Sequence, residues 1–211
     1  MISERDLGYI RQLYTEKGYV EYTEPYKLNI FGVRNFNMKV NIFNEQVGVY
    51  YFLPFDGEVK VKLFPATTKP GLYWMRNLIN PKGTAILVEG QYENAYKIAL
   101  HNGKYQALCQ RLEKVAVYRD RNRDDKHDPD PSTIEWGMFG INIHRASAAK
   151  VLFNIDSYSA GCQAIKHPAH FDELMNHAYQ HLEIYGNKFT YTLLKEQDIF
   201  RIYLRTVHAR G

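Results

Sequence analysis

Short runs of β-branched and aromatic residues recur along most of this chain, and asparagine, aspartate and glycine separate them. No helical spacing of apolar residues lies between these runs. Many closely spaced strands without intervening helices favour a β-sandwich or barrel over an alternating α/β sheet. Asp56 and Gly57 suit the turn of a hairpin. The expected strands are 28–33, 47–53, 59–64, 71–75, 85–88, 96–100, 115–118 and 139–143, within a β core at about 28–165.

Two segments outside this core have the apolar spacing of amphipathic helices. The first begins with Ser3 and Asp6, which suit a helix cap, and ends at Gly18, which predicts a helix over 3–18. The second begins at Pro168 and ends before Gly186, which predicts a helix over 168–185. A C-terminal strand region is expected over 189–207, of which 199–207 is a last strand or a short helix. With no linker or internal repeat, the prediction is one mainly β (α+β) domain over 1–211.

Composition and charge narrow the class of protein. The formal charge is +4, but the Lys and Arg residues are not clustered in a block of the sequence. A nucleic-acid partner is therefore not expected. The 17 Tyr, 11 Phe and 2 Trp suit both strands and a glycan-binding surface. No stretch approaches the roughly 18 apolar residues of a membrane span, and the N-terminus lacks the apolar core of a signal peptide. We therefore expect a chain made in the cytoplasm, which needs delivery or release to act at a cell wall.

The residues with the clearest chemistry are a histidine and a cysteine. His144 follows the apolar run 139–143, and Cys162 follows Ser159 and Gly161 in a tight turn. A thiol is mostly protonated at neutral pH, and an adjacent imidazole can remove its proton. Glycine before the nucleophile permits a sharp turn whose backbone N–H groups can hold an oxyanion. Cys109, the second of two cysteines, lies in an apolar run, where a buried structural thiol is expected.

The order and spacing of these residues resemble the signature of the bacterial L,D-transpeptidase catalytic domains. His144 is followed by fourteen residues, then by Ser159, Ala160, Gly161 and Cys162. The resemblance implies that Cys162 attacks a stem-peptide carbonyl of peptidoglycan to form a thioester. His144 would be the general base, the Gly161 and Cys162 amides would lie at the oxyanion, and no cofactor would be needed. In papain-like peptidases the cysteine precedes the histidine, which is the opposite order.

The resemblance covers about residues 63–165 and includes two differences. Upstream, 64–73 is similar to a strand, turn and Pro-Gly-x-aromatic hairpin of the family. The family's second histidine, two residues before the cysteine, is Ala160 here. The asparagine or arginine usual two residues after the cysteine is Ala164. Both a diverged enzyme and a binding domain without activity fit these changes.

Residues around the pair are candidates for substrate binding. Arg145 follows the base and suits a substrate carboxylate. Tyr158 and Gln163 flank the cysteine turn, where Ser159 either assists catalysis or bonds the backbone. His101, in an expected hairpin, is a candidate for the substrate groove.

Two patterns resemble metal sites without completing them. His177 and His181 have the i, i+4 spacing of a metal pair, but no acid between them matches the zinc-protease pattern, and a polar helix face is expected. In the loop after residue 119, Asp120, Asn122, Asp124 and Asp128 occupy positions one, three, five and nine of a calcium-type loop. Asp125 stands where that loop has glycine, and Pro131 stands where it has glutamate. A charged surface loop is favoured over a calcium site.

Three functions remain open on the sequence alone. The leading hypothesis is a peptidoglycan-acting cysteine enzyme, more hydrolytic than wall-building, such as a lysis enzyme encoded by a phage. The second is a non-catalytic wall- or glycan-binding module on a decayed transpeptidase scaffold. The third is a cysteine amidase or protease with an unrelated substrate. The sequence leaves the oligomeric state undetermined.

Overall fold

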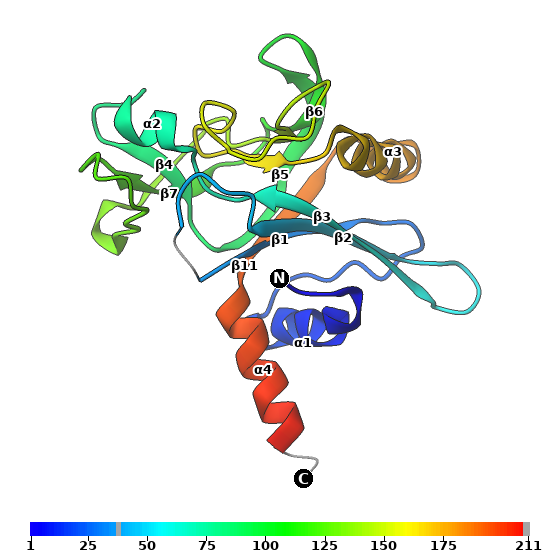
Figure 1. Cartoon of the computed structure of the whole chain (residues 1–211). Helices are drawn as coiled ribbons and strands as arrows, with labels where there is room; N and C mark the ends of the chain where they lie inside the picture. The colour runs from blue at the N-terminus through cyan, green and yellow to red at the C-terminus, as the bar shows by residue number, and fades with distance from the viewer. Residues whose placement is uncertain (37–38, 209–211) are drawn as a thin grey trace.

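A closed β-barrel forms the centre of the computed structural model, which describes residues 1–36 and 39–208 (Figure 1). The described strands follow the barrel in the order β1 (Asn29–Arg34), β11 (Phe189–Lys195), β5 (Gly90–His101), β6 (Tyr105–Gln110), β9 (Ile143–Arg145), β10 (Gln163–Ile165), β3 (Val59–Thr67) and β2 (Glu45–Phe52). A second sheet has the order β4 (Thr84–Leu87), β7 (Val115–Asp120) and β8 (Glu135–Gly137). The chain is thus α+β with mostly sheet, as predicted.

Two parallel pairs occur in the barrel, β1 with β11 and β9 with β10. The other barrel pairs are antiparallel, including the β2–β3 hairpin, whose turn contains Asp56 and Gly57 as predicted. A parallel pair cannot be joined by a tight turn, so residues 146–162 form a long connection between β9 and β10. That connection returns the chain so that β10, which follows Cys162, pairs with β9, which contains His144.

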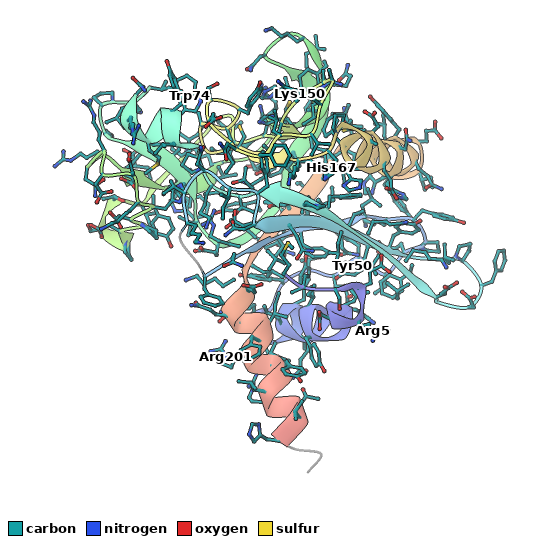
Figure 2. All side chains as sticks on the ribbon, viewed as in Figure 1. Arg5, Tyr50, Trp74, Lys150, His167 and Arg201 are labelled. Carbon is teal, nitrogen blue, oxygen red and sulfur yellow. The ribbon has the colours of Figure 1, made fainter. Side chains whose placement is uncertain are left out.

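Side chains alternate between the two faces of each strand, so one hydrophobic core lies inside the barrel and a second lies on its outer face. Val47 and Val49 of β2 point into the main cluster, which α3 (Pro168–Tyr185) also joins. Tyr50 points outward and packs against Tyr14 of α1 (Leu7–Lys17), as its position in Figure 2 shows. Strands β1 and β2 are therefore buried on both faces.

Both predicted helices occur at their predicted places. The Asp6 carboxylate accepts hydrogen bonds from the Ser3 N–H (2.7 Å) and hydroxyl (2.9 Å) in the short 3-10 turn Glu4–Asp6 before α1. Gly18 ends α1 in the left-handed conformation, with φ of 67°. Helix α3 covers Pro168–Tyr185, the predicted range. Among the described helices, none combines the length and apolar character needed to cross a membrane.

Three strand predictions are wrong in whole or in part. Residues 72–76 form the short helix α2, because aromatic side chains such as Tyr73 and Trp74 suit either structure when packing decides. The strand expected over 139–143 is found as β9 (Ile143–Arg145), which begins only at the last expected residue. Gly140 has φ of 70°, and this left-handed conformation interrupts an extended strand before residue 143. The C-terminal region 189–207 is β11 followed by the helix α4 (Glu196–His208), the alternative left open for 199–207. Glu196 and Asp198 in the first turn favour that helix.

Candidate active site

The turn before Cys162 is held by hydrogen bonds of Ser159. The Ser159 hydroxyl donates to the Cys162 carbonyl (2.7 Å) and accepts from the Gly161 N–H (3.2 Å). Gly161 has φ of 125°, and a Cβ atom there would overlap the Ala85 carbonyl. No residue but glycine fits this position without rearrangement. Ser159 is buried, so its role in this structure is to shape the turn.

The Cys162 amide is available to an oxyanion, whereas the Gly161 amide is already used. Within the described residues, the Cys162 N–H donates no hydrogen bond, while the Gly161 N–H donates to Ser159. Of the two amides expected at an oxyanion, the geometry therefore offers that of Cys162 first.

Parallel pairing of β9 and β10 places Cys162 and His144 on one face of the barrel. The register matches Gln163 with Ile143 and Ala164 with His144. Side chains alternate along a strand, so Cys162 and Ala164 share the face that Asn142 and His144 occupy. Ala164 is the residue of β10 that lies beside His144, and Cys162 precedes it by two positions on the same face.

The Cys162 thiol is protonated and bound to the backbone. Its Sγ accepts from the Asn142 N–H (3.4 Å) and donates to the Gly140 carbonyl (3.5 Å). In the described part of the chain Sγ has no hydrogen bond to His144. Burial raises the pKa of the thiol to about 11, and the Asn142 N–H opposes that shift. The resting site therefore holds a thiol rather than a thiolate.

The His144 imidazole is neutral, with a defined tautomer. Its Nδ1–H donates to the Arg145 carbonyl (2.8 Å), so the unprotonated nitrogen is Nε2. Burial lowers the pKa of His144 to about 3, and the nearby His101 ring adds to the shift. A neutral imidazole with a free Nε2 lone pair can accept a proton, but a general base works best when its pKa lies near the operating pH, so the burial of His144 opposes that role.

His101 stacks on His144 instead of lining an open groove. The two rings are 4.2 Å apart with an interplanar angle of 17°. The Gln110 N–H donates to Asn142 Oδ1 (3.0 Å), so the Asn142 Nδ2 group faces His101 and donates to its Nδ1 (3.0 Å). Asn142 thereby contacts Cys162 through its backbone and the histidine stack through its side chain.

A pocket of about 220 Å³ opens beside Cys162. Apolar side chains, among them Trp74, Ile79 and Phe139, form much of its wall. Arg119 adds a cation to the wall and lies over the Phe139 ring at 4.7 Å while pairing with Glu135 (2.8 Å). The pocket has room for about one amino-acid residue.

The predicted substrate-binding residues occupy different environments. Arg145 lies over the Tyr105 ring at 4.1 Å and is half-buried. Tyr158 is exposed near the turn. Gln163 is fully buried, and its Oε1 accepts from the Tyr191 hydroxyl (3.0 Å) inside the barrel. The prediction that Gln163 meets substrate is therefore wrong in this structure, because β10 alternation turns it inward. Gly32 leaves the space that the Tyr191 hydroxyl occupies.

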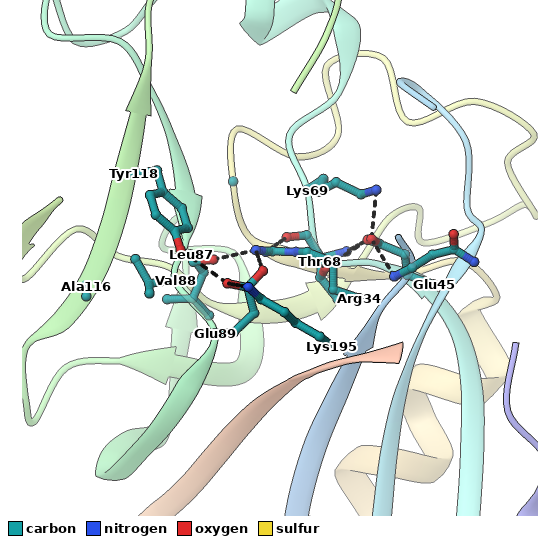
Figure 3. Close-up of polar contacts among 12 residues, drawn as sticks. Arg34, Glu45, Thr68, Lys69, Leu87, Val88, Glu89, Ala116, Tyr118 and Lys195 are labelled. Carbon is teal, nitrogen blue, oxygen red and sulfur yellow. Dashed lines mark hydrogen bonds and ion pairs between the residues drawn. The ribbon is translucent and has the colours of Figure 1, made fainter. Parts of the chain in front are cut away.

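A buried ionic network supports the segment under the nucleophile turn (Figure 3). Glu45 accepts from Lys69 Nζ (2.9 Å) and from the Thr68 hydroxyl (2.8 Å). Arg34 donates to the Thr68 carbonyl (2.6 Å) and to Glu89 (2.9 Å). The network fixes residues 67–69, which lead to the Gly71 N–H that donates to the Ser159 carbonyl (2.8 Å). The turn thus rests on a charged core that joins β1, β2 and the end of β3.

Several site residues were not found from the sequence. Asn142 and Tyr105 position the histidines, and Arg111 is the cation that lowers the pKa of the Cys162 thiol against the effect of burial. Arg119 lines the pocket. Asn142 lies two residues before His144, and residues two apart in a strand share one face. The sequence could therefore have predicted Asn142 on the same face as His144. The others come from β6, β7 or the loop after β6, and only the folded barrel brings them to the site.

The calcium-type loop is held by its own side chains. Asn122 Nδ2 donates to Asp128 (2.8 Å), and Asp120 accepts from the Asp128 N–H (2.9 Å). Asp124 accepts from the Lys126 N–H (3.0 Å). Across the described residues, no group of three or more His, Cys, Asp or Glu side chains is arranged to hold a metal ion. A charged surface loop accounts for this segment.

The two histidines with helical i, i+4 spacing serve different contacts. His181 is buried, accepts from the Leu28 N–H through Nδ1 (3.0 Å) and donates to the Lys188 carbonyl through Nε2 (3.2 Å). His177 lies against the Tyr51 ring at 5.3 Å. The expected polar face is therefore partly a packing face, and neither ring is part of a metal pair.

No family model, curated protein or solved structure matches this chain significantly.

Proposed function

We propose that this chain is a cysteine enzyme that cleaves or exchanges stem-peptide bonds of bacterial peptidoglycan through a thioester on Cys162, with hydrolysis favoured. The observation that carries the proposal is the arrangement of one parallel strand pair. It sets a neutral His144, with Nε2 unprotonated, on the same face as Cys162.

The reaction begins with proton transfer. The Cys162 S–H proton moves to His144 Nε2 as Sγ forms a bond to the substrate carbonyl carbon. The carbonyl oxygen gains the electron pair and accepts a hydrogen bond from the Cys162 N–H. When the intermediate collapses, the C–N bond breaks and the leaving amine takes the proton from His144. Water then attacks the thioester in hydrolysis, or a second amine attacks it in exchange.

The resting thiol requires a reorientation before this step. Sγ donates to the Gly140 carbonyl, and burial raises the pKa of the thiol. Rotation about the Cα–Cβ bond releases that weak contact and redirects the thiol. The pKa of His144, about 3 at rest, lies far below that of the thiol, about 11, so the proposal requires substrate binding to bring the two pKa values closer before the proton moves. Arg111 lowers the pKa of the thiol and favours the thiolate once it forms.

The substrate class follows from the motif and from the pocket. The order and spacing of His144, Ser159, Gly161 and Cys162 resemble the L,D-transpeptidases, which act on peptidoglycan stem peptides. The pocket beside Cys162 fits about one residue and has a guanidinium in its wall. Small residues and free carboxylates are both characteristic of stem peptides. Ala160, which replaces the family's second histidine, also lines this pocket and leaves it more open.

A non-catalytic wall- or glycan-binding module is the second candidate. The observation in its favour is the thiol itself, which is protonated and held by backbone groups rather than by His144. Exposed aromatic side chains at Tyr73 and Trp136 suit contact with sugar rings. Under this alternative the chain binds the cell wall and catalyses no reaction.

The test compares wild type with Cys162→Ala on intact peptidoglycan, and mass spectrometry identifies the products. Cys109→Ala is the matched control, because it removes the other cysteine, whose thiol hydrogen-bonds the Ala99 carbonyl and does not line the pocket. We expect stem-peptide cleavage or exchange by wild type and Cys109→Ala, and none by Cys162→Ala. Equal inactivity of all three with binding to sacculi retained would replace the enzyme by the binding module. Turnover of general peptides but not of muropeptides would indicate an unrelated cysteine amidase or protease.

A further inference from the structure

His101 meets the proposed base from a distant part of the sequence. It is the last residue of β5, whereas His144 lies in β9, and β6 pairs with both strands. The two imidazole rings stack 4.2 Å apart with an interplanar angle of 17°, and the exposed fractions of the two residues are 8% and 4%. His101 therefore presents the face of its ring, rather than a ring nitrogen, to His144.

The amide of Asn142 determines where His101 carries its proton. A backbone N–H can only donate, so the Gln110 N–H (3.0 Å) identifies the Asn142 atom that faces it as Oδ1. Arg111 Nη1 approaches the same oxygen (3.5 Å). The Nδ2 group of Asn142 therefore faces His101 and donates to its Nδ1 (3.0 Å), which must offer a lone pair. His101 is thus the neutral tautomer with its proton on Nε2.

The other neighbours of His101 are compatible with that tautomer. Asn102 lies beside Nε2 (3.2 Å) and is exposed, so its amide can turn the oxygen toward the Nε2–H. Tyr105 packs on the ring, with the two ring centroids 5.4 Å apart. Burial and the Arg111 guanidinium both lower the pKa of His101. A second proton on Nδ1 would have to displace the Asn142 Nδ2 group and would lie near this cation.

A neutral ring affects the base differently from a charged one. A protonated His101 would oppose protonation of His144, which is how its charge lowers the pKa of that imidazole. A neutral His101 instead offers a π face, and a cation over such a face is attracted to it, most strongly where water is excluded. The imidazolium that forms when His144 takes the Cys162 proton would lie in that position. Neutral His101 would therefore favour the charged form of its neighbour and offset part of the cost of burial.

We infer that His101 is a positioning residue for the proposed base: Asn142 keeps it neutral, so the stacked pair takes one proton, on His144. The inference rests on the proposed function, in which His144 accepts the proton of Cys162. The uncharged ring stabilises the imidazolium while Sγ bonds to the carbonyl carbon. No proton passes between the two rings, because their N–H bonds lie in the ring planes.

The first test reads the protonation state of both rings by heteronuclear NMR of the imidazole nitrogens. From pH 7.5 to pH 6 we expect one proton on His101, at Nε2, and one on His144, at Nδ1. Asn142→Asp replaces the Nδ2 donor by a carboxylate, so His101 should gain a second proton at Nδ1. Asn102→Asp is the matched control, because it adds the same charge beside Nε2 without removing the donor at Nδ1.

Two results of this test would overturn the inference. One is a doubly protonated His101 in wild type, which is decisive even where Asn142→Asp does not fold. The other is the same protonation state of His101 in Asn142→Asp and Asn102→Asp, since the Asn142 amide would then not determine it.

The second test measures the effect of the ring face through the thiol. Alkylation of Cys162 by iodoacetamide requires removal of the S–H proton, and mass spectrometry of a digest reports Cys109 from the same sample as an internal control. His101→Phe keeps an aromatic face and His101→Leu removes it. We expect a rate near that of wild type for His101→Phe and a rate about three- to tenfold lower for His101→Leu. His144→Gln gives the rate without the base, and circular dichroism checks that each variant folds.

The outcomes separate this inference from the proposed function. Equal alkylation rates of Cys162 in His101→Leu and wild type, or equal losses in His101→Leu and His101→Phe, would overturn the inference. The expected contrast in alkylation together with no turnover of intact peptidoglycan would refute the proposed function and support the role of His101.

Discussion

We expect the free energy of unfolding to fall already in mildly acidic solution, before the carboxylates titrate, because three of the buried histidines have strongly lowered pKa values. Burial lowers the pKa of His144 to about 3, and those of His127 and His181 to about 4. In the unfolded chain a histidine has a pKa of about 6.5. Below about pH 6.5 these histidines are therefore protonated in the unfolded state but remain neutral in the folded state. Proton binding then stabilises the unfolded state, and the free energy of unfolding falls as the pH drops.

The size of the effect follows from these pKa values. Between pH 7.5 and 5.5, each unfolded histidine gains most of a proton while the folded one stays neutral. Linkage gives a loss of about 1.4 kcal/mol per histidine, or about 4 kcal/mol for the three together. His181 has the clearest physical cause, because its Nδ1 already accepts from the Leu28 N–H and would have to release it on protonation.

Urea unfolding at both pH values measures this loss directly. We expect wild type to lose about 4 kcal/mol and His181→Gln to lose about 1.4 kcal/mol less than wild type over the same interval. His208→Gln, at an exposed position on α4, serves as the control and should follow wild type. A wild-type free energy of unfolding that is flat from pH 7.5 to 5.5 would refute the assignment of buried neutral histidines.

Two further predictions concern the supports of the nucleophile turn. Gly161→Ala should abolish peptidoglycan turnover and cost about 1–3 kcal/mol in urea unfolding, since φ is 125° and the added Cβ meets the Ala85 carbonyl; a fully active variant of wild-type stability would contradict the turn geometry. Lys69→Met should cost about 3–5 kcal/mol by leaving Glu45 buried without its ion pair, whereas Lys60→Met, which breaks an exposed pair, should unfold at nearly the same urea concentration as wild type. Equal losses in the two variants would show that the buried network contributes no more than a surface pair.

Local signals in the sequence predicted much of the fold. The Ser3–Asp6 cap, Gly18 and the Pro168 start each depend on neighbouring residues, and each of these helices forms where expected. The Asp56–Gly57 turn is equally local and also correct. In contrast, Tyr73 and Trp74 have strand propensity but lie in a helix of five residues, because contacts such as Trp74 Nε1 to the Ser157 carbonyl (2.8 Å) decide their conformation.

The site was only partly predictable for a similar reason. Spacing along the chain predicted Cys162 and His144 as a pair, and the barrel places them on one face. It could not reveal that His101, from the end of β5, would stack on His144, since no local pattern links residues 43 positions apart. Gln163 was misplaced because a strand of three residues is too short to show which face is buried.

The long connection between β9 and β10 has a consequence for when reactivity appears. Ala146, Leu152 and Ile155 of this connection cover Ala164 in a small cluster of their own. Cys162 and His144 lie on segments that meet only when the parallel strands β9 and β10 pair, which requires the long connection between them to close. If Cys162 reacts as proposed, a chain in which β9 and β10 have not yet paired would carry the thiol without its proposed base, so activity would depend on closure of the barrel.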